Sequence, residues 1–401
     1  MALIDQTDIY AYLKTLCVDS GFFRVPKNAM YKPTDLANVL IHASTSTANS
    51  IESAVQDLLV SFADSNIPCA DTVHSYLQNV PKDELLNSFA TMNSFFSDLS
   101  LIHDTAQTLA IDFHNIPYYG SKNTKCISGI QPKNGTSWGH SYLTTDIVGS
   151  FNQTLDVIPL TGLNKDYSIL IEGILKRIRT QRISIEKILM DREFFNLKVI
   201  QACENGDTKF IMPAKYDKRI KAVVSEFEKN NGRVPGIFHY KFKDATCPWF
   251  YLILMPNQFY DPSKKDGIDN KRFFTFATNI EYGSAEEFCS SVPKEYRVRW
   301  NIETGYRVKN IFKIRTCSKS PIVRLFLFLL QCLIHNYLNM LKRILSITAY
   351  ALKSVVQKGL LISLERKLGK ENPVSFTDFY NNGVQFNEFR IYEFRNHLGL
   401  I

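Results

Sequence analysis

TLAIDFH (Thr108–His114) is an apolar run with β-branched residues, and it ends in the turn-rich segment NIPYYGSKN. A short apolar run bounded by turn residues is typical of a buried strand. The segments after it read in the order strand, strand, helix, strand, helix, strand: SYLTTDIVG, QTLDVIPL, DYSILIEGILKRIRTQ, SIEKILMD, EFFNLKVIQACENG and KFIMPA. We therefore predict that residues 105–214 form the first part of a mixed α/β sheet with flanking helices.

The segment before this sheet, residues 1–104, is predicted to be helical throughout. Apolar residues recur at helical spacing in DIYAYLKTLC and SIESAVQDLLVSFA, and Pro81 precedes a further helical run, KDELLNSFATMNSFF. The stretch IPCADTVHSYLQNV resembles the second helix of a helix-turn-helix, which would bind DNA ends through Thr72, His74, Ser75 and Gln78. A plain helical bundle is the alternative interpretation.

Three further parts follow the sheet. Residues 215–284 are predicted to be a β-rich insertion, with short strands in GIFHYKFK, PWFYLILM and RFFTFATNI. Residues 285–345 would contain one helix starting near Pro293, PKEYRVRWNIETGYRVKNIF, and a second, PIVRLFLFLLQCLIHNYLNMLKRIL, and residues 346–401 a helical tail. The run LFLFLL (Leu325–Leu330) is too short and too closely flanked by polar residues for a membrane span, so we predict a buried helix and no membrane partner.

The overall composition is that of an ordinary folded protein, with 45% hydrophobic and 21% charged residues among 401. The eight cysteines include no C-x-x-C pair, which argues against a structural zinc site or a disulfide framework and favours a reducing compartment. The first residues, MALIDQTDIY, carry acids where a signal peptide has a basic and then an apolar run. We therefore expect a cytoplasmic protein.

Charge is distributed unevenly along the chain. The net charge is +8, yet residues 1–100 contain 5 Lys/Arg against 11 Asp/Glu. The segment Ala285–Lys370, in contrast, contains 16 basic and 5 acidic residues. A basic surface of this kind attracts a phosphate backbone, although a solvated helix face rich in lysine would have the same composition.

Three acids are candidates for a catalytic site. Asp112 lies in the first predicted strand, Asp191 ends SIEKILMD, and Glu303 is the only acid in the helical run RVRWNIETGYRVKNIF. Adjacent strand ends of an α/β sheet converge on one edge. Magnesium prefers hard oxygen ligands, and two ions about 3.5–4 Å apart can activate an attacking oxygen and stabilise a leaving one. The acids thus predict a phosphoryl-transfer site, while for either Asp alone helix capping is the alternative.

The helix around Glu303 presents an unusual face. At about 100° per residue, Tyr296, Arg299, Arg307 and Asn310 all fall within about 40° of Glu303. A stripe that faced the core would not carry two arginines, so we predict a face that contacts phosphate. The alternative is an internal salt-bridge ladder of Arg299, Glu303 and Arg307.

Tyr296-x2-Arg299-x3-Glu303, within YRVRWNIETGYR, resembles the YREK signature of DDE-type insertion-sequence transposases, a group found in archaea and bacteria. LAIDFHNIPYYG and LMDREFFNLKVI resemble the first and second Asp motifs of this group, and SPIVRLFLFLLQCLIHNYLNM resembles its helix after the catalytic Glu. The likeness covers about Thr108 to Leu341, with the motifs in the family order. It implies an RNase H-like core with a β-rich insertion before the Glu helix.

The resemblance also implies a function, cut-and-paste DNA transposition by cleavage of transposon ends and strand transfer. Asp112, Asp191 and Glu303 would hold two Mg²⁺ ions, with Mn²⁺ as a substitute. The partners would be double-stranded DNA, as terminal inverted repeats and target, and a second copy of the chain in the DNA complex. The location would be the prokaryotic cytoplasm, at the nucleoid. Trp249 in the insertion would be a platform for a flipped base, or else a core tryptophan.

The sequence departs from the family pattern at two places. The family's lysine is expected seven residues past the Glu, where this chain has Asn310; Lys309 stands one place early, and Arg307 or Lys313 would make that phosphate contact instead. Glu193 stands where many relatives have Gly, and it would add charge near the metals or face solvent. Two other functions stay open: an RNase H-type nuclease that does not join DNA, and a catalytically silent, domesticated DNA-binding protein.

Overall fold

The protein is described by a computed structural model that covers residues 6–62, 65–100, 102–160, 166–229, 236–244, 248–261, 263, 272–344 and 347–368. The chain divides into two compact units. Unit 1 comprises residues 1–101, 117–139 and 305–401, and unit 2 comprises residues 102–116 and 140–304. The predicted tail beyond residue 368, and Cys247, lie outside the described residues.

Unit 1 is built mainly of helices: α1 (Gln6–Asp19), α2 (Pro33–Thr45), α3 (Ile51–Ser61), α4 (Ala70–Gln78), α5 (Lys82–Leu99), α11 (Pro321–Ile344) and α12 (Ala349–Leu368). Local capping explains some of their boundaries. The hydroxyl of Ser50, for example, accepts a hydrogen bond from the backbone N–H of Ser53 at the start of α3. The prediction that the first hundred residues are helical is confirmed.

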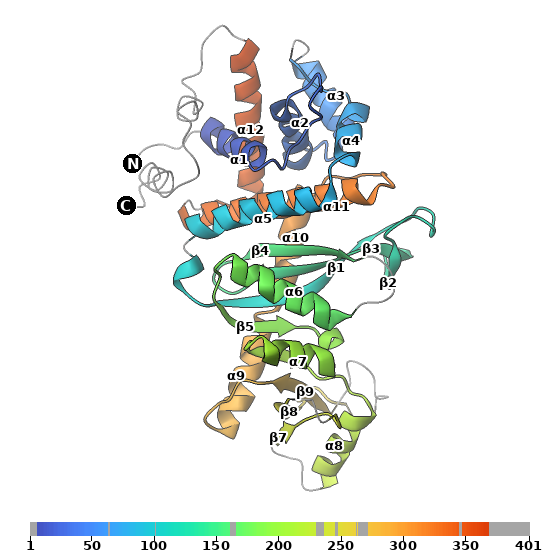
Figure 1. Ribbon diagram of the computed structural model, residues 1–401, viewed down its shortest axis with the longest axis vertical. Helices are drawn as coiled ribbons and strands as arrows, with labels where there is room; N and C mark the ends of the chain where they lie inside the picture. Colours follow the sequence, from blue (N-terminus) through green and yellow to red (C-terminus); the bar gives the residue numbers. More distant parts are fainter. Residues whose placement is uncertain are drawn as a thin grey trace. The chain divides into compact units, whose positions relative to one another are not determined.

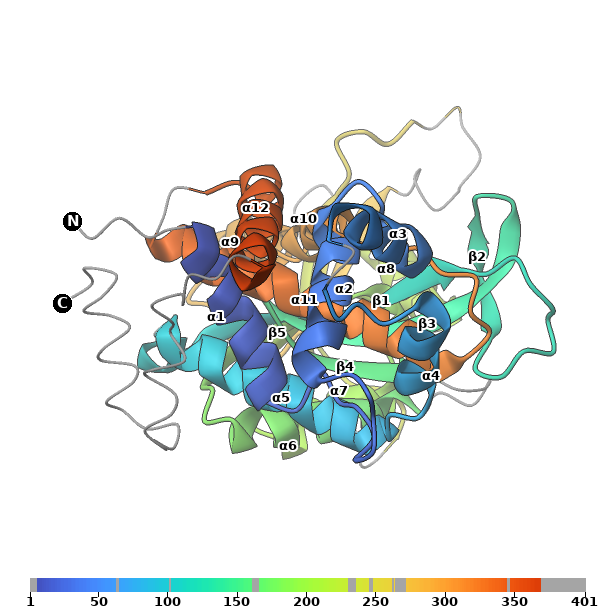
Figure 2. The same ribbon diagram turned by 90° about the horizontal axis from the view of Figure 1, so that it is seen from above.

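Helix α11 is the apolar centre of unit 1. It lies beside α5 (Figure 1), and α12 lies beside α1 (Figure 2). Among the described residues, one stretch, Pro321–Lys342, is long and apolar enough to cross a membrane, and 83% of its most apolar window is buried. Its few polar groups find partners: the Asn336 amide donates to Asn93 Oδ1 at 2.7 Å. The prediction of a buried helix at Leu325–Leu330 is confirmed.

The strands form one mixed sheet in the order β2-β3-β1-β5-β6-β9-β8-β7, with β4 also paired to β3. They are β1 (Gln107–Pro117), β2 (Ser128–Lys133), β3 (Thr136–Ile147), β4 (Gln153–Leu160), β5 (Ile185–Met190), β6 (Phe210–Pro213), β7 (Gly236–Tyr240), β8 (Phe250–Pro256) and β9 (Phe273–Thr278). β5 pairs in parallel with both β1 and β6, whereas β3–β4 and the pairs from β6 to β7 are antiparallel. The predicted mixed α/β sheet is therefore confirmed.

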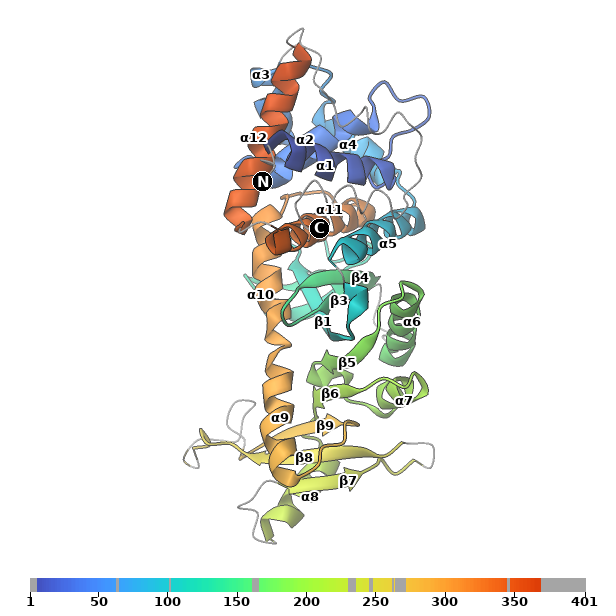
Figure 3. The same ribbon diagram turned by 90° about the vertical axis from the view of Figure 1, so that its left-hand side faces the viewer.

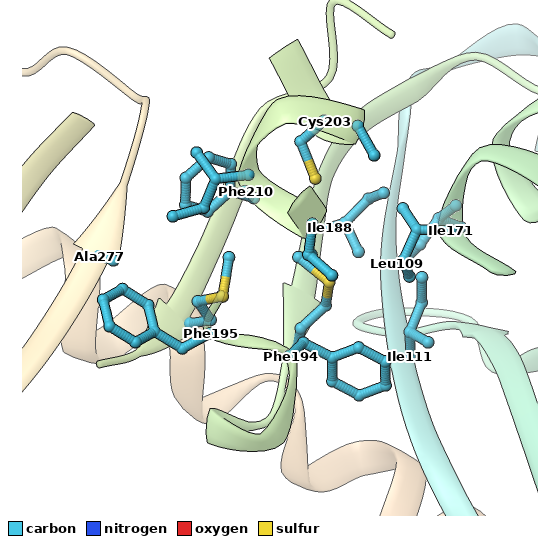
Figure 4. Packing of buried hydrophobic residues seen from close by; sticks show 14 of the residues in the cluster. Leu109, Ile111, Ile171, Ile188, Phe194, Phe195, Cys203, Phe210 and Ala277 are labelled. Carbon is cyan, nitrogen blue, oxygen red and sulfur yellow. The ribbon is translucent and has the colours of Figure 1, made fainter. Parts of the chain in front are cut away.

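Helices cover both faces of the sheet in unit 2. Figure 3 shows α6 (Tyr167–Thr180) and α7 (Leu197–Asn205) on one side and α9 (Ala285–Arg297) on the other. The carboxylate of Asp166 caps α6, and the amide oxygen of Asn196 caps α7. A large cluster of apolar side chains fills the core between helices and sheet, as Leu109, Ile171 and Phe194 illustrate (Figure 4).

The β-rich insertion differs in one respect from the prediction. Its three predicted strands form as β7, β8 and β9, and they extend the main sheet. Residues expected to be loop, however, form helix α8 (Lys218–Lys229). This helix buries Ile220 and Val224, which stand four residues apart, and Asp217 accepts hydrogen bonds from the first free N–H groups.

Strand β2 was also missed. It forms a hairpin with β3 through Asn134 and Gly135, both of which have positive φ. Such Asn-Gly pairs favour two-residue hairpins because both turn positions need the left-handed region.

The predicted start of the Glu303 helix is wrong. The helix begins at Ala285, where the hydroxyl of Ser284 accepts from the N–H of Glu287, and Pro293 lies inside it. It is not continuous either. α9 ends at Arg297 and α10 (Trp300–Lys309) begins after a turn at Val298 and Arg299.

Candidate active site

Asp112 and Asp191 lie next to each other at one edge of the unit 2 sheet. β1 and β5 are parallel neighbours, and Ile111 stands opposite Met190 in their register. Asp112 follows Ile111 within β1, and Asp191 directly follows Met190, the last residue of β5. Because neighbouring strands are about 4.8 Å apart, the two carboxylates emerge side by side. The prediction that parallel strands bring these two acids together is consistent with this register.

The carboxylates of Asp112 and Asp191 have different surroundings. Asp191 Oδ1 accepts from the N–H of Arg192 at 2.7 Å and caps a short 3-10 turn, Arg192–Phe194, so the capping alternative also holds for this residue. Asp112 is nearly buried, and its Oδ1 accepts from the N–H of Phe113 at 2.8 Å. Burial raises the pKa of Asp112 to about 6, against the opposing charge of Arg299.

The guanidinium group of Arg299 bridges Glu303 and Asp112. Arg299 Nη1 donates to Asp112 Oδ2 at 2.8 Å, and Nη2 donates to Glu303 Oε1 at 3.1 Å. The side chain of Arg299 is 9% exposed and that of Asp112 15%, whereas Glu303 is 55% exposed. The Arg299–Glu303 part of the predicted ladder is thus present, and Arg299 also pairs with Asp112.

The position of Arg299 follows from the break between α9 and α10. Its N–H donates to the carbonyl of Tyr296 at 3.0 Å, which closes the turn after α9. Its guanidinium lies over the Tyr296 ring, 5.6 Å from the centroid, and the ring packs edge-on against Phe276. Burial opposes the charge of Arg299, but Tyr296 and the acids raise its pKa. Among the described atoms, Arg299 Nε has no hydrogen-bond partner.

The three predicted acids therefore converge, yet they are not assembled as metal ligands. Asp112 and Glu303 share one guanidinium, and the charge of Asp191 acts on both Asp112 and Arg299. In the part of the chain that the structure describes, no three acidic, histidine or cysteine side chains are grouped to hold a metal ion. The donor chemistry fits Mg²⁺ or Mn²⁺, because all three groups are hard oxygens. An ion on Asp112 Oδ2 or Glu303 Oε1 would compete with Arg299 for that oxygen.

A cleft of about 730 Å³ opens beside these residues in unit 2. Asp191, Arg299 and Glu303 contribute to its lining. Much of the remaining wall is aromatic or apolar: Pro213, Met255, Pro256, Phe259, Phe273, Phe274, Phe276, Pro293, Tyr296 and Trp300. Trp300 is 63% exposed and stands three residues before Glu303, on the same side of the helix. The sequence reasoning missed Trp300, although this spacing was a signal for it.

Trp249 does not lie in the core, so the alternative interpretation of this residue is wrong. It is 51% exposed, so it is not a core tryptophan. Its ring stacks on His239 with centroids 4.6 Å apart, and Lys241 Nζ lies 5.0 Å from the ring centre. Trp249 does not contribute to the lining of the cleft beside the carboxylates. Its assignment as a platform for a base stays a prediction.

The basic residues predicted to contact phosphate have unequal access to solvent. Arg307 is exposed on α10. Lys309 is fully buried, and its ammonium lies 4.8 Å from the centre of the Tyr306 ring. This burial argues against a direct contact of Lys309 with DNA. Asn310, which stands where the resemblance would place a lysine, accepts a hydrogen bond from the Gln331 amide at 3.3 Å.

Lys313 belongs to a group of cations in unit 1. Partial burial and then the charges of Arg324, Lys133 and Arg315 lower the pKa of Lys313. Arg324 lies over the ring of Tyr118, 5.0 Å from its centroid. Repulsion among these cations would be relieved by a bound anion.

Two other predicted groups can be located. Glu193 is exposed, as the solvent-facing interpretation expected. On α4, Ser75 and Gln78 are exposed, but His74 contacts Glu52 at 3.0 Å and Thr72 contacts Cys69. A groove-reading role for this helix stays a prediction.

No protein-family model matches the chain, and no curated protein matches it at a significant level.

Proposed function

We propose that this chain is a DDE-type DNA transposase that cleaves transposon ends and joins them to target DNA. The observation that carries the proposal is the convergence of Asp112, Asp191 and Glu303 beside an open cleft. These acids come from distant parts of the sequence, and a helix capped by Asp191 would not require the other two. A cluster of this kind suits phosphoryl transfer with divalent ions.

An RNase H-like core is the finer part of the proposal. The supporting pattern is the succession β1, β3, β4, α6, β5, α7 and β6, in which β3 and β4 are antiparallel and β1, β5 and β6 are parallel. This is the predicted order of three strands followed by two helix–strand units. The hairpin strand β2 is an addition to it.

Asp112, Asp191 and Glu303 would hold the ions. Bound Mg²⁺ or Mn²⁺ would activate the attacking oxygen and stabilise the leaving oxygen. The chain itself contributes the buried setting of Asp112 and the rigid packing of Tyr296 against Phe276. The aromatic wall of the cleft offers a surface on which an unpaired base would stack.

Double-stranded DNA is the proposed partner, with a homodimer assembling on it at the nucleoid. The support is the charge of the chain, the exposed Arg307 and the cation group around Lys313. These contacts would be independent of DNA sequence, because phosphates position a duplex without identifying its bases.

A cleavage and joining assay tests the proposal against its two alternatives. The substrate is the DNA that flanks the gene, with Mg²⁺ or Mn²⁺. We expect cleavage at an end and transfer of the freed strand to a second duplex. Cleavage without joining would identify a nuclease instead, and binding without cleavage would identify a silent DNA-binding protein. Glu193→Gln is a control for Glu303→Gln, since it removes an exposed acid outside the proposed ligand set.

A further inference from the structure

Arg299 holds a permanent positive charge where the proposed ions would bind. A guanidinium stays protonated at all accessible pH, and its fork of donors matches carboxylate oxygens. In this structure the fork is divided between Asp112 Oδ2 and Glu303 Oε1. One cation therefore neutralises two of the three proposed ligands.

The contacts leave little freedom for an ion to share Asp112 with Arg299. Asp112 Oδ1 accepts from the backbone of Phe113, and Oδ2 accepts from Arg299. Both atoms are engaged in a nearly buried setting, where electrostatic interactions are strong. A divalent ion on Asp112 Oδ2 would repel the guanidinium at close range. Ion and arginine should exclude each other.

Two features of Arg299 would allow its side chain to move when an ion competes for the acids. Arg299 belongs to the turn between α9 and α10, so its side chain can change position without breaking a backbone hydrogen bond of either helix. Its Nε lacks an acceptor among the described atoms, although the side chain is buried, and the residue lines the cleft. An anion in the cleft could provide that acceptor.

We propose that Arg299 closes the metal site of the DNA-free protein by competing with divalent ions for Asp112 and Glu303. The inference rests on the proposed function, since it assumes that these acids bind ions. Arg299 is here a positioning residue that sets when the ligands become available. Such competition would keep the site inactive until the arginine is withdrawn.

The test is Mn²⁺ affinity of the DNA-free, full-length protein, measured from the spin-resonance signal of free Mn²⁺. Loss of the Arg299 charge raises the pKa of Asp112 further, so the pH is held well above the pKa of Asp112 in each variant and its carboxylate is ionised throughout. Arg299→Met should tighten Mn²⁺ binding at least about fivefold. Arg297→Met is the matched control, because it removes an exposed positive charge two residues away without touching Asp112 or Glu303. Equal affinities of the two variants would overturn the inference.

Arg299→Lys keeps the test decisive if the methionine variant does not fold. Lysine retains the charge that compensates buried Asp112, but a single ammonium lacks the planar fork. Mn²⁺ should bind this variant more tightly than wild type, and unchanged or weaker binding would contradict the competition.

Asp112→Asn separates failure of the inference from failure of the proposed function. Unchanged Mn²⁺ binding in Asp112→Asn would show that the acid is no ligand, and the proposed function would fall. Loss of binding in Asp112→Asn with no tightening in either Arg299 variant would overturn only the closing role of Arg299.

Discussion

Arg299 and Asp112, 187 positions apart in the sequence, form a 2.8 Å ion pair that is almost closed to solvent. The pair ties the turn between α9 and α10 to the central strand β1. A charge pair in such a setting is strongly coupled, because each ion has given up most of its hydration. Its removal has consequences for stability as well as for function.

Arg299→Ala should lower the free energy of unfolding by roughly 3 kcal/mol, because it leaves Asp112 as an uncompensated buried carboxylate. Urea denaturation without metal ions measures this loss. Glu303→Gln is the comparison, and it should cost less than about 1 kcal/mol since Glu303 is half exposed. Asp112→Asn should reduce the effect of Arg299→Ala. Additive losses in the double variant would show that the pair is not coupled.

Asp112 should also make stability depend on pH. Its pKa in the folded protein is about 6, above the ordinary value of 3.8, so the folded state binds the proton more tightly than the unfolded state. The contribution of Asp112 to the free energy of unfolding should therefore fall as pH rises through this window, by roughly 3 kcal/mol in total. Urea denaturation of wild type and Asp112→Asn at several pH values, without metal ions, isolates the contribution of Asp112 to the free energy of unfolding. Parallel curves across the window would contradict the raised pKa.

Much of the fold could be predicted because the local patterns agree with the burial. The residues Leu109–Ile111 form a continuous apolar run and are fully buried in a central parallel strand. Helices α6 and α7 each begin at a capping side chain, Asp166 and Asn196, directly before an amphipathic run. Pattern and tertiary structure demand the same conformation there.

The missed elements had weaker or competing signals. Ser284 followed three residues later by Glu287 is a capping-box spacing, and Pro293 is a competing signal for a helix start. Helix α8 is short and highly charged, so the spacing of its two buried side chains was the only apolar signal for a helix there.

The candidate site could be predicted only in part. The strand positions of Asp112 and Asp191 follow from local pattern, and Glu303 came from the motif. The partner of Arg299 could not be predicted, since the stripe was drawn on a continuous helix and the helix breaks at Val298. A contact over 187 positions depends on tertiary packing, which no local spacing encodes.

The three acids should be needed for chemistry more than for DNA binding. Asp112→Asn, Asp191→Asn and Glu303→Gln should each slow strand cleavage at least about a hundredfold, because ion contacts provide several kcal/mol in the transition state. Affinity for end DNA, measured by fluorescence anisotropy, should change little. Any acid whose variant cleaves at the wild-type rate does not belong to the site.

Trp300 and Trp249 are competing candidates for a base-stacking platform. Trp300 lines the cleft beside Glu303, whereas Trp249 stacks on His239 away from that lining. Stacking of a base on an aromatic ring contributes about 1–3 kcal/mol. Trp300→Leu should therefore weaken binding of DNA with an unpaired base at the cut, by about tenfold relative to fully paired DNA. A larger selective loss in Trp249→Leu would assign the platform to Trp249 instead.

Arg307 and Arg299 should differ in how they affect the salt dependence of DNA binding. Each phosphate contact releases counterions, so loss of one contact lowers the log–log salt slope by about one. Arg307 is exposed, and Arg307→Ala should lower the slope with or without divalent ions.

Arg299 is held by Asp112 and Glu303 in the absence of metal, and Arg299→Ala should then leave the slope unchanged. With Ca²⁺, which we expect to occupy the acids without supporting cleavage, the guanidinium is displaced toward the cleft and the same substitution should lower the slope by about one. Binding titrations at several salt concentrations, with Ca²⁺ or a chelator, measure all four values. A slope for Arg299→Ala that is lowered equally in both conditions would mean that Arg299 contacts phosphate without first being displaced by metal.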